Sequence, residues 1–224
     1  MPRPIRTTTA DHCFHVINRG NGRAEVFHKN GDYAAFLRLI NEASERLPMR
    51  LLAYCLMPNH FHLVLRPYVD GDMSRWMQWL MTSHVRRYHR HYGGSGHVWQ
   101  GRFKSFPIQD DDHLLCVMRY VERNPVRSKT IPTRKAERWP WSSIGSPPSD
   151  VERPVLEPSP VARPKNWLEW VNEPQTESEL NALHECINRG RPFGSESWQR
   201  LTANQLGLES SLRARGRPRK LAIK

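Results

Sequence analysis

Residues 49–65 constrain the fold of this chain more than any other stretch. They contain two almost entirely apolar runs, 49–57 (MRLLAYCLM) and 60–65 (HFHLVL), separated by Pro58-Asn59. The second run alternates, with Phe61, Leu63 and Leu65 on one side, so both runs predict β-strands divided by a break. Apolar residues at helical spacing in 32–47 and from residue 73 to 88 predict a helix on each side of this strand pair.

Two further strands and a last helix complete the pattern. Residues 12–18 predict a first strand, and residues 102–108 predict a fourth. Three aspartates at 110–112 favour a helix start, and Pro125 ends that helix. The order β-α-β-β-α-β plus a helix is that of a ferredoxin-like α+β fold with an added C-terminal helix. Its antiparallel sheet leaves one face open for a ligand or for the added helix.

The character of the chain changes after residue 130. Residues 131–165 contain eight prolines, which predicts an extended connector, although its Trp139-Pro140-Trp141 is expected to pack back on the first domain. Helical patches in 166–212 predict a small helical appendage, followed by the basic end RARGRPRKLAIK. The predicted organisation is therefore a domain over 1–130, a connector over 131–165 and a helical C-terminal region over 166–224.

The charge balance predicts a polyanionic partner. There are 34 Lys and Arg against 22 Asp and Glu, a formal net charge of +12, and phosphate contacts make nucleic acid the expected ligand. An anionic membrane is the competing partner, but we find no apolar run of about 18 residues that could span one. The start MPRPIRTTTADH lacks the apolar core of a signal peptide, and four widely spaced cysteines form no CxxC pair. We expect a cytoplasmic protein with reduced thiols.

Two histidines are set into the second apolar run. A strand repeats every two residues, so His60 and His62 point to the same face. Burying two neutral imidazoles without partners costs about 1–3 kcal/mol each. A shared metal ion would remove that cost, and hydrogen bonds inside the core are the alternative. Two nitrogens do not complete a metal site, so a third ligand is expected.

The last helix offers that ligand and a nucleophile. Tyr120 and Asn124 are spaced i, i+4 and share one face, on which His113 lies two turns earlier. Asn124, in the final turn before Pro125, could supply its side-chain oxygen, although asparagine also often caps a helix end. Tyr120 could equally be a half-buried tyrosine with its hydroxyl in water. His113 is a candidate base for Tyr120.

Together these residues resemble the single-tyrosine HUH endonuclease superfamily, whose signature is two histidines around a hydrophobic residue, here His60-Phe61-His62. The chain is most similar to the bacterial REP-associated tyrosine transposases, where REP is a repetitive extragenic palindrome. The pair followed by Y-x-x-x-N-P on a later helix is the specific part of the resemblance. The matching stretches cover nearly the whole chain: HVINRG (15–20), YCLMPNHFHLVL (54–65), WQGRFKS (99–105), RYVERNPVRS (119–128), WPWSS (139–143) and residues 187–220.

The resemblance implies a role for each site residue. His60, His62 and Asn124 would hold a divalent ion, Mg²⁺ or Mn²⁺, which suits imidazole nitrogens combined with an amide oxygen. Tyr120 would attack a DNA phosphate, forming a 5′-phosphotyrosine link and freeing a 3′ hydroxyl. That link preserves a phosphoester, so a second DNA end can reverse the attack and be joined. The implied activity is cleavage and strand transfer of single-stranded DNA beside palindromic hairpins.

Basic side chains near these motifs are the candidate DNA-binding residues. Single-strand sites combine a basic groove with aromatic platforms. The RGRPRK segment (215–220) also resembles an AT-hook, a minor-groove binder, although a generic basic tail is an equal alternative. The candidates are Arg19, Arg86, Arg87, Arg90, Arg102, Lys104, Arg217, Arg219 and Lys220.

Two other functions remain open at this stage. A metal hydrolase would need a carboxylate base near the histidine pair, and no HExxH pattern is present. A domesticated, non-catalytic protein that only binds hairpin DNA would tolerate the change Tyr120→Phe. The sequence leaves the oligomeric state open between monomer and homodimer. The resemblance places the protein in a bacterial cytoplasm, at the nucleoid.

Overall fold

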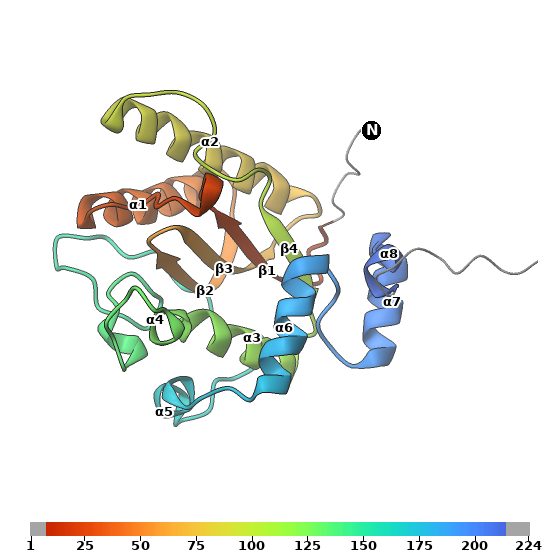
Figure 1. The fold of residues 1–224 in the computed structure, drawn as a ribbon. Coiled ribbons are helices and arrows are strands. Elements are labelled where there is room, and N and C mark those ends of the chain that lie inside the picture. Colours follow the sequence, from red (N-terminus) through yellow and green to blue (C-terminus); the bar gives the residue numbers. More distant parts are fainter. Residues whose placement is uncertain (1–7, 214–224) are drawn as a thin grey trace, which may run out of the picture.

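The computed structural model describes residues 8–213, and its centre is a four-stranded sheet. The strands are β1 (Cys13–Arg19), β2 (Met49–Met57), β3 (His60–Pro67) and β4 (Lys104–Ile108). Their order is β2-β3-β1-β4, and every neighbouring pair is antiparallel (Figure 1). This α+β architecture confirms the predicted ferredoxin-like arrangement, with β1 and β3 in the middle of the sheet.

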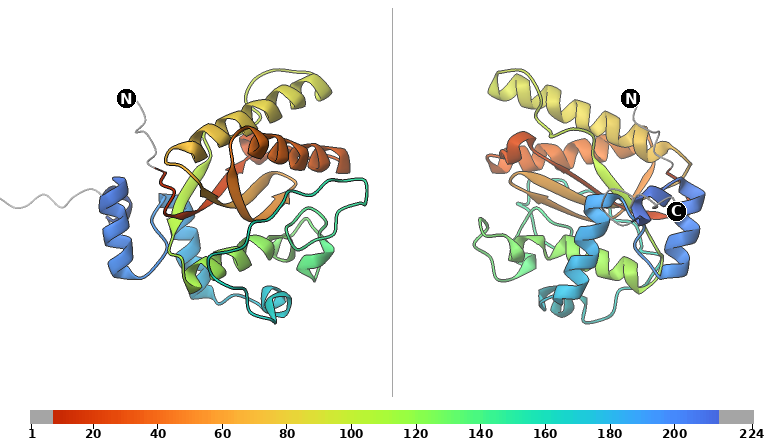
Figure 2. Two further views of the ribbon diagram at one scale, coloured as in Figure 1. Left: turned by 180° about the vertical axis from the view of Figure 1, so that it is seen from behind. Right: turned by 45° about the vertical axis from the view of Figure 1, so that its right-hand side comes forward.

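Two helices, α1 (Asn30–Arg46) and α2 (Asp72–Tyr92), cover one face of the sheet (Figure 2). The alternation of β3 sends Phe61, Leu63 and Leu65 to this side, where they pack into one core with the apolar stripes of both helices. The intervening residues His60, His62 and Val64 therefore face the other side of the sheet. The pattern that predicted the strand thus also fixes which face carries the histidines.

The helix α3 (Asp112–Glu122) packs on that other face, as expected for the added helix. Asp111 caps its start by accepting a hydrogen bond from the backbone N–H of His113. The expectation that the helix runs on to Asn124 is wrong. It ends at Glu122, and Asn124 begins a second short helix, α4 (Asn124–Arg127). Pro125 occupies the first turn of α4, where a missing N–H costs nothing.

The proline-rich segment packs along the exposed edge of β2. Backbone N–H groups of Leu56 and Ser143 pair with the carbonyls of Trp141 and Tyr54 respectively, so the segment satisfies edge groups that would otherwise invite aggregation. The Trp141 ring is buried and stacks on Tyr33, with ring centroids 5.0 Å apart. The expected return of residues 139–141 to the first domain is confirmed. A single turn, η2 (Ala136–Arg138), precedes them, and another, η1 (Asn21–Arg23), follows β1.

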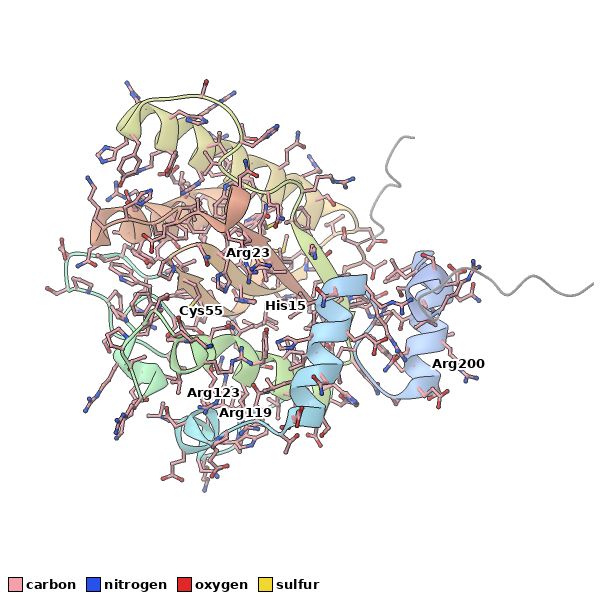
Figure 3. The ribbon with its side chains drawn as sticks, viewed as in Figure 1. His15, Arg23, Cys55, Arg119, Arg123 and Arg200 are labelled. Atoms are coloured by element: carbon pink, nitrogen blue, oxygen red, sulfur yellow. The ribbon has the colours of Figure 1, made fainter. Side chains whose placement is uncertain are left out.

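The C-terminal region is helical, as predicted, and contacts the rest of the chain. It contains α5 (Trp167–Asn172), α6 (Glu177–Arg189), α7 (Glu196–Leu206) and α8 (Glu209–Leu212). Arg119 of α3 and Arg123, which directly follows this helix, reach toward α5 and donate hydrogen bonds to carbonyls at its end (Figure 3). Phe193 pairs through its backbone with Pro107 and Gln109 at the end of β4, which holds α6 beside the sheet. The division into domains at residues 130 and 165 stays a prediction.

None of the helices within residues 8–213 is both long and apolar enough to cross a membrane.

Candidate active site

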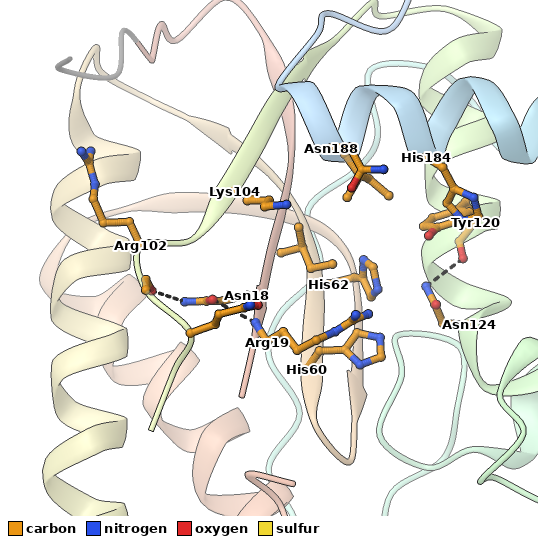
Figure 4. Close-up of a pocket in the computed structure, with 14 residues that line it drawn as sticks. Asn18, Arg19, His60, His62, Arg102, Lys104, Tyr120, Asn124, His184 and Asn188 are labelled. Carbon is orange, nitrogen blue, oxygen red and sulfur yellow. Dashed lines mark hydrogen bonds between the residues drawn. The ribbon is translucent and has the colours of Figure 1, made fainter. Parts of the chain in front are cut away.

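A cavity of about 540 Å³ opens where β1, β3, α3 and α6 meet (Figure 4). It is lined by Ile17, Asn18, Arg19, His60, His62, Gln100, Gly101, Arg102, Lys104, Tyr120, Asn124, His184, Ile187 and Asn188. Four of these residues are the predicted metal ligands and nucleophile, and three are predicted DNA-binding residues. The fold therefore brings together side chains that lie more than a hundred residues apart in the sequence.

His60 is held in one protonation form by its neighbour. The His60 Nδ1 lies 2.6 Å from the Asn59 Oδ1, and the Asn59 Nδ2 donates to the carbonyl of Arg23. Because the Asn59 amide nitrogen is thereby committed, its oxygen must accept, so Nδ1 of His60 carries the hydrogen. The Nε2 of neutral His60 then keeps its lone pair, and this is the nitrogen that a metal ion would bind.

His62 is bonded to a third histidine, which the sequence analysis missed. Its Nδ1 lies 2.8 Å from the Nε2 of His15, in the middle of β1. His15 is completely buried, and its ring also packs on Phe106 and near Tyr120. The sequence signal was present, since HVINRG begins with this residue, but the contact depends on the register between two strands.

All three imidazoles stay neutral at physiological pH. Burial lowers the pKa of His15 to about 3. Burial, together with the positive charges of Arg19 and Arg127, lowers the pKa of His60 to about 3 as well. The pKa of His62 falls well below its ordinary value, chiefly through burial and then through the neighbouring histidines. Neutral rings offer lone pairs, so burial prepares these groups to be ligands.

Tyr120 and Asn124 stand across the cavity from the histidine pair (Figure 4). The ring of Tyr120 lies 5.7 Å from that of His62, centroid to centroid. The Asn124 Nδ2 donates to the carbonyls of Tyr120 and Val121, so the side-chain oxygen is the accepting end of the amide. The i, i+4 prediction is confirmed as a spatial relation, although the two residues belong to successive helices.

Arg127 ties these two residues together. Its guanidinium stacks on the Tyr120 ring at 3.8 Å from the centroid and donates to the Asn124 Oδ1 at 3.1 Å. It also donates to the carbonyl of Tyr120. Sequence reasoning overlooked this residue because its spacing of seven from Tyr120 passes through the break at Pro125.

The helix α6 closes one side of the cavity with His184, Ile187 and Asn188. The ring of His184 lies 6.1 Å from that of Tyr120, in an edge-to-face arrangement. Burial and the charge of Arg127 lower the pKa of His184. The apolar stripe of α6 could be predicted from the sequence. The position of this helix over the cavity could not, since no local pattern shows which surface a helix will cover.

His113 is not a candidate base for Tyr120, contrary to the expectation from helical spacing. Its Nδ1 bonds to the Asp111 Oδ1 at 2.7 Å, and its ring packs on Phe193. It lines a different cavity, between α3 and the C-terminal region. Two turns of helix separate it from Tyr120, so sharing a face did not bring it to the same cavity.

The predicted DNA-binding residues fall into five groups. Arg19, Arg102 and Lys104 line the cavity, and Arg86 and Arg102 line an adjoining apolar groove of about 720 Å³ along α2. Arg87 is engaged within the fold, since it forms an ion pair with Asp32. Arg90 is exposed in the last turn of α2. The remaining three, Arg217, Arg219 and Lys220, lie outside the described residues.

Arg19 owes its position to the glycine that follows it. It stands directly opposite His60 in the sheet, at the end of β1. A Cβ on Gly20 would come within 2.1 Å of the Ala24 carbonyl oxygen, so only glycine lets the chain turn sharply here. The RG of HVINRG therefore places a guanidinium beside the histidine pair.

The donor set fits a hard divalent ion better than zinc. The cavity is lined by two imidazoles and one amide that could supply ligands, and none of the described residues that line it is Asp or Glu. Within residues 8–213, no group of three or more His, Cys, Asp and Glu side chains could hold a metal ion. An amide oxygen with room for water is typical of Mg²⁺ and Mn²⁺ sites, whereas zinc sites are more often closed or completed by carboxylate.

Comparison with known proteins agrees with this fold. The model of the family "Transposase IS200 like" matches residues 8–124, more than half of the chain. A curated protein of Haemophilus influenzae, named "Putative REP-associated tyrosine transposase", is 29% identical over 120 residues. That match covers 49% of this chain and 66% of the relative, just under two thirds of its length.

A solved structure of a REP-associated tyrosine transposase bound to a REP hairpin shares the fold. Its TM-score with this chain is 0.50 at 20% sequence identity, over 63% of this chain and 81% of that one. The family match over residues 8–124 identifies the class of protein as a transposase. The chain belongs to the IS200-like transposase family, and it resembles the REP-associated members of that family.

Proposed function

We propose that this protein is a metal-dependent endonuclease and strand transferase for single-stranded DNA, which cleaves next to palindromic hairpins through a 5′-phosphotyrosine intermediate. The observation that supports it most directly is the cavity itself. Tyr120 faces His60 and His62 across one basic cavity, and Asn124, whose oxygen accepts one hydrogen bond from Arg127, lines the same cavity.

The chemistry requires few parts. The Tyr120 oxygen forms a bond to phosphorus while the bond from phosphorus to the 3′ oxygen of the preceding nucleotide breaks. Tyr120 loses its proton, and the departing 3′ oxygen gains one. When bound by His60, His62 and Asn124, a divalent ion would supply polarisation of the scissile phosphate and neutralise the charge that develops. Attack by a second DNA 3′ hydroxyl on the phosphotyrosine reverses the step and joins the new strand.

The proton of Tyr120 needs an acceptor, and α6 offers one. His184 is exposed, lies against the Tyr120 ring and is neutral at physiological pH because its pKa is lowered. A neutral imidazole can take a proton through one water molecule. This role replaces the one that spacing suggested for His113.

The substrate is matched by charge and by access. Arg19, Arg102 and Lys104 surround the mouth of the cavity, where they can bind phosphates on either side of the scissile bond. A tyrosine that is almost completely buried is reached more easily by a single strand than by a duplex. The related protein bound to a REP hairpin supports a palindromic hairpin as part of the substrate.

The test is a covalent-adduct assay on a denaturing gel. Labelled hairpin oligonucleotides with single-stranded flanks, drawn from palindromes near the gene, are incubated with protein and Mg²⁺, Mn²⁺ or EDTA. We expect a covalent protein–DNA band with wild type that is lost in EDTA and in Tyr120→Phe. The matched control is Tyr68→Phe, which removes the hydroxyl of an exposed tyrosine far from the cavity and should leave the band unchanged.

Hairpin binding without any covalent band, over several palindromes, would refute the catalytic proposal. It would leave a non-catalytic hairpin-binding protein on a transposase fold. Because the rings of Tyr120 and His62 of the same chain lie 5.7 Å apart, we expect activity from a monomer. Sedimentation of the active protein would decide between monomer and homodimer.

A further inference from the structure

His15 occupies a position that the proposed chemistry does not use. It lies in the middle of β1, two residues before Ile17, which stands directly opposite His62 in the sheet. Both side chains point to the α3 face, and the Nε2 of His15 meets the Nδ1 of His62 at 2.8 Å. His15 does not line the cavity, so it cannot touch a substrate there.

The two cavity histidines differ in how their protons are fixed. His60 donates from its Nδ1 to the Asn59 oxygen, and that direction is set because the Asn59 nitrogen donates to the carbonyl of Arg23. The partner of His62 is another imidazole, which can donate or accept. Within the described residues, no polar atom bonds the other nitrogen of His15, so nothing else sets the direction.

A metal ligand removes this ambiguity. The nitrogen of His62 that is not bonded to His15 is Nε2, and an ion can bind it only through a lone pair. The hydrogen of neutral His62 must then sit on Nδ1, and His15 must accept it through Nε2. The opposite arrangement, with His15 donating, would place a hydrogen on the very atom that the ion needs.

We propose that His15 is a positioning residue of the metal site, which accepts the Nδ1 hydrogen of His62 and so holds the His62 Nε2 lone pair toward the cavity. This inference rests on the proposed metal-dependent function. His15 acts through His62 and makes no contact of its own with the ion or the DNA. Residue 15 must therefore present a hydrogen-bond acceptor, and bulk alone is not sufficient.

Two substitutions distinguish the hydrogen-bond acceptor of His15 from the space that its side chain fills. His15→Gln places an amide oxygen the same number of bonds from the backbone as the histidine Nε2, and an amide can turn to accept. His15→Phe fills similar space without a polar atom. The matched control is His84→Phe, which replaces another buried histidine, on the far side of the sheet among Phe27, Phe36 and Trp99.

The measurement is a titration of each protein with Mn²⁺, followed by electron paramagnetic resonance of the free ion, without DNA. We expect His15→Phe to weaken Mn²⁺ binding by about 10- to 100-fold, the usual effect of losing a hydrogen bond to a metal-ligating histidine. His15→Gln should stay within a few-fold of wild type, and His84→Phe should match it. Thermal unfolding in EDTA checks that each variant is folded.

The outcomes separate this inference from the proposed function. If wild type binds no Mn²⁺, or if His60→Ala binds it as tightly as wild type, the proposed metal site itself fails. If wild type binds Mn²⁺ and His15→Phe binds it equally well, the role of His15 is overturned while the metal site stands. Equal losses in His15→Gln and His15→Phe would overturn the acceptor role and leave only a packing role.

A second readout needs no variant and covers the case in which His15→Phe does not fold. Nitrogen NMR of the histidine rings in wild type reports which nitrogen carries the hydrogen. With Mg²⁺ bound, we expect the hydrogen of His62 on Nδ1 and an unprotonated Nε2 on His15. A hydrogen found on the His15 Nε2 in the Mg²⁺-bound protein would contradict the inference.

Discussion

At the scale of single residues, Arg127 has the most connections in the site. One guanidinium stacks on Tyr120, donates to the Asn124 oxygen and also donates to the backbone of Tyr120. These contacts need a planar group with several donors in fixed directions, which lysine lacks. Arg127 therefore orients the proposed nucleophile and the proposed amide ligand together.

We predict that Arg127→Lys slows formation of the covalent adduct by about 10- to 100-fold, because small misplacements of reacting groups cost rates of this size. Hairpin affinity should change little, since the positive charge is kept. The measurement is the rate of adduct formation at saturating hairpin, with anisotropy for affinity. Arg38→Lys, an exposed change of the same kind on α1, is the control and should react at the wild-type rate. A normal rate in Arg127→Lys would show that only charge matters here.

His84 gives a prediction for pH and stability away from the cavity. It is buried among aromatic rings, and burial, with the charge of Arg87, lowers its pKa to about 3. In the unfolded chain the same group titrates near 6.5, so below that pH the unfolded state takes up a proton that the folded state does not. Stability is therefore lost as the pH falls from about 6.5 toward 3, and nothing is lost above 6.5.

Between pH 7.5 and 5.5 the contribution of His84 to this loss is about 1.4 kcal/mol. Urea unfolding in EDTA at the two pH values measures it. In His84→Phe the drop in unfolding free energy should be smaller than in wild type by that amount, whatever the absolute stability of the variant. An unchanged drop would mean that His84 is protonated in the folded protein.

At the scale of elements, Glu122 joins α3 to the proline-rich segment. Its carboxylate is completely buried and accepts from the Ser143 hydroxyl at 2.6 Å and the Trp167 indole at 2.7 Å. Arg163 completes the cluster with an ion pair of 3.2 Å. Burial raises the pKa of Glu122, against the lowering effect of Arg163. One side chain thus holds two points of the proline-rich segment, Ser143 and Arg163, and also Trp167 at the start of α5.

We predict that Glu122→Ala lowers the unfolding free energy by about 3 kcal/mol, because it leaves buried donors and a partly buried guanidinium without a partner. Urea unfolding measures the loss. Limited proteolysis should show faster cleavage between residues 131 and 166 than in wild type. Glu152→Ala, an exposed change within that segment, is the control. Equal protease resistance in both variants would show that the tryptophans alone hold the segment.

Helices and strands whose apolar residues repeat regularly could be predicted from the sequence, whereas contacts between these elements could not. β2 spans the predicted residues, and the period of two in β3 correctly placed His60 and His62 on one face. His15 was missed because its contact runs diagonally across a strand pair. The position of α6 was missed because it depends on α3 and β4, which lie far away in the sequence. Local pattern fixes a side chain's face, whereas register and packing decide what that face meets.

At the scale of the whole molecule, the net charge is +12, and only some of the basic side chains lie where they could bind DNA at the cavity. Arg19, Arg102 and Lys104 meet at the cavity, whereas Arg200 lies on the outer side of α7, paired with Glu196 (Figure 3). A general positive field steers DNA toward the protein, but only charges that bind phosphate release counterions on binding. The salt dependence of affinity therefore distinguishes basic side chains that contact phosphate from those that only add to the general positive field.

We predict that Lys104→Ala weakens hairpin binding and reduces the slope of log affinity against log salt by about 0.7 to 1, the release expected from one phosphate contact. Arg200→Ala, which removes a charge of the same sign from the far surface, should leave the slope unchanged. The measurement is fluorescence anisotropy with a labelled hairpin between about 50 and 200 mM salt. Each change is made in the Tyr120→Phe background, so that covalent trapping does not distort the equilibrium. Equal slopes for the two variants would place the DNA away from the cavity, and a reduced slope for Lys104→Ala alone would place a phosphate at its mouth.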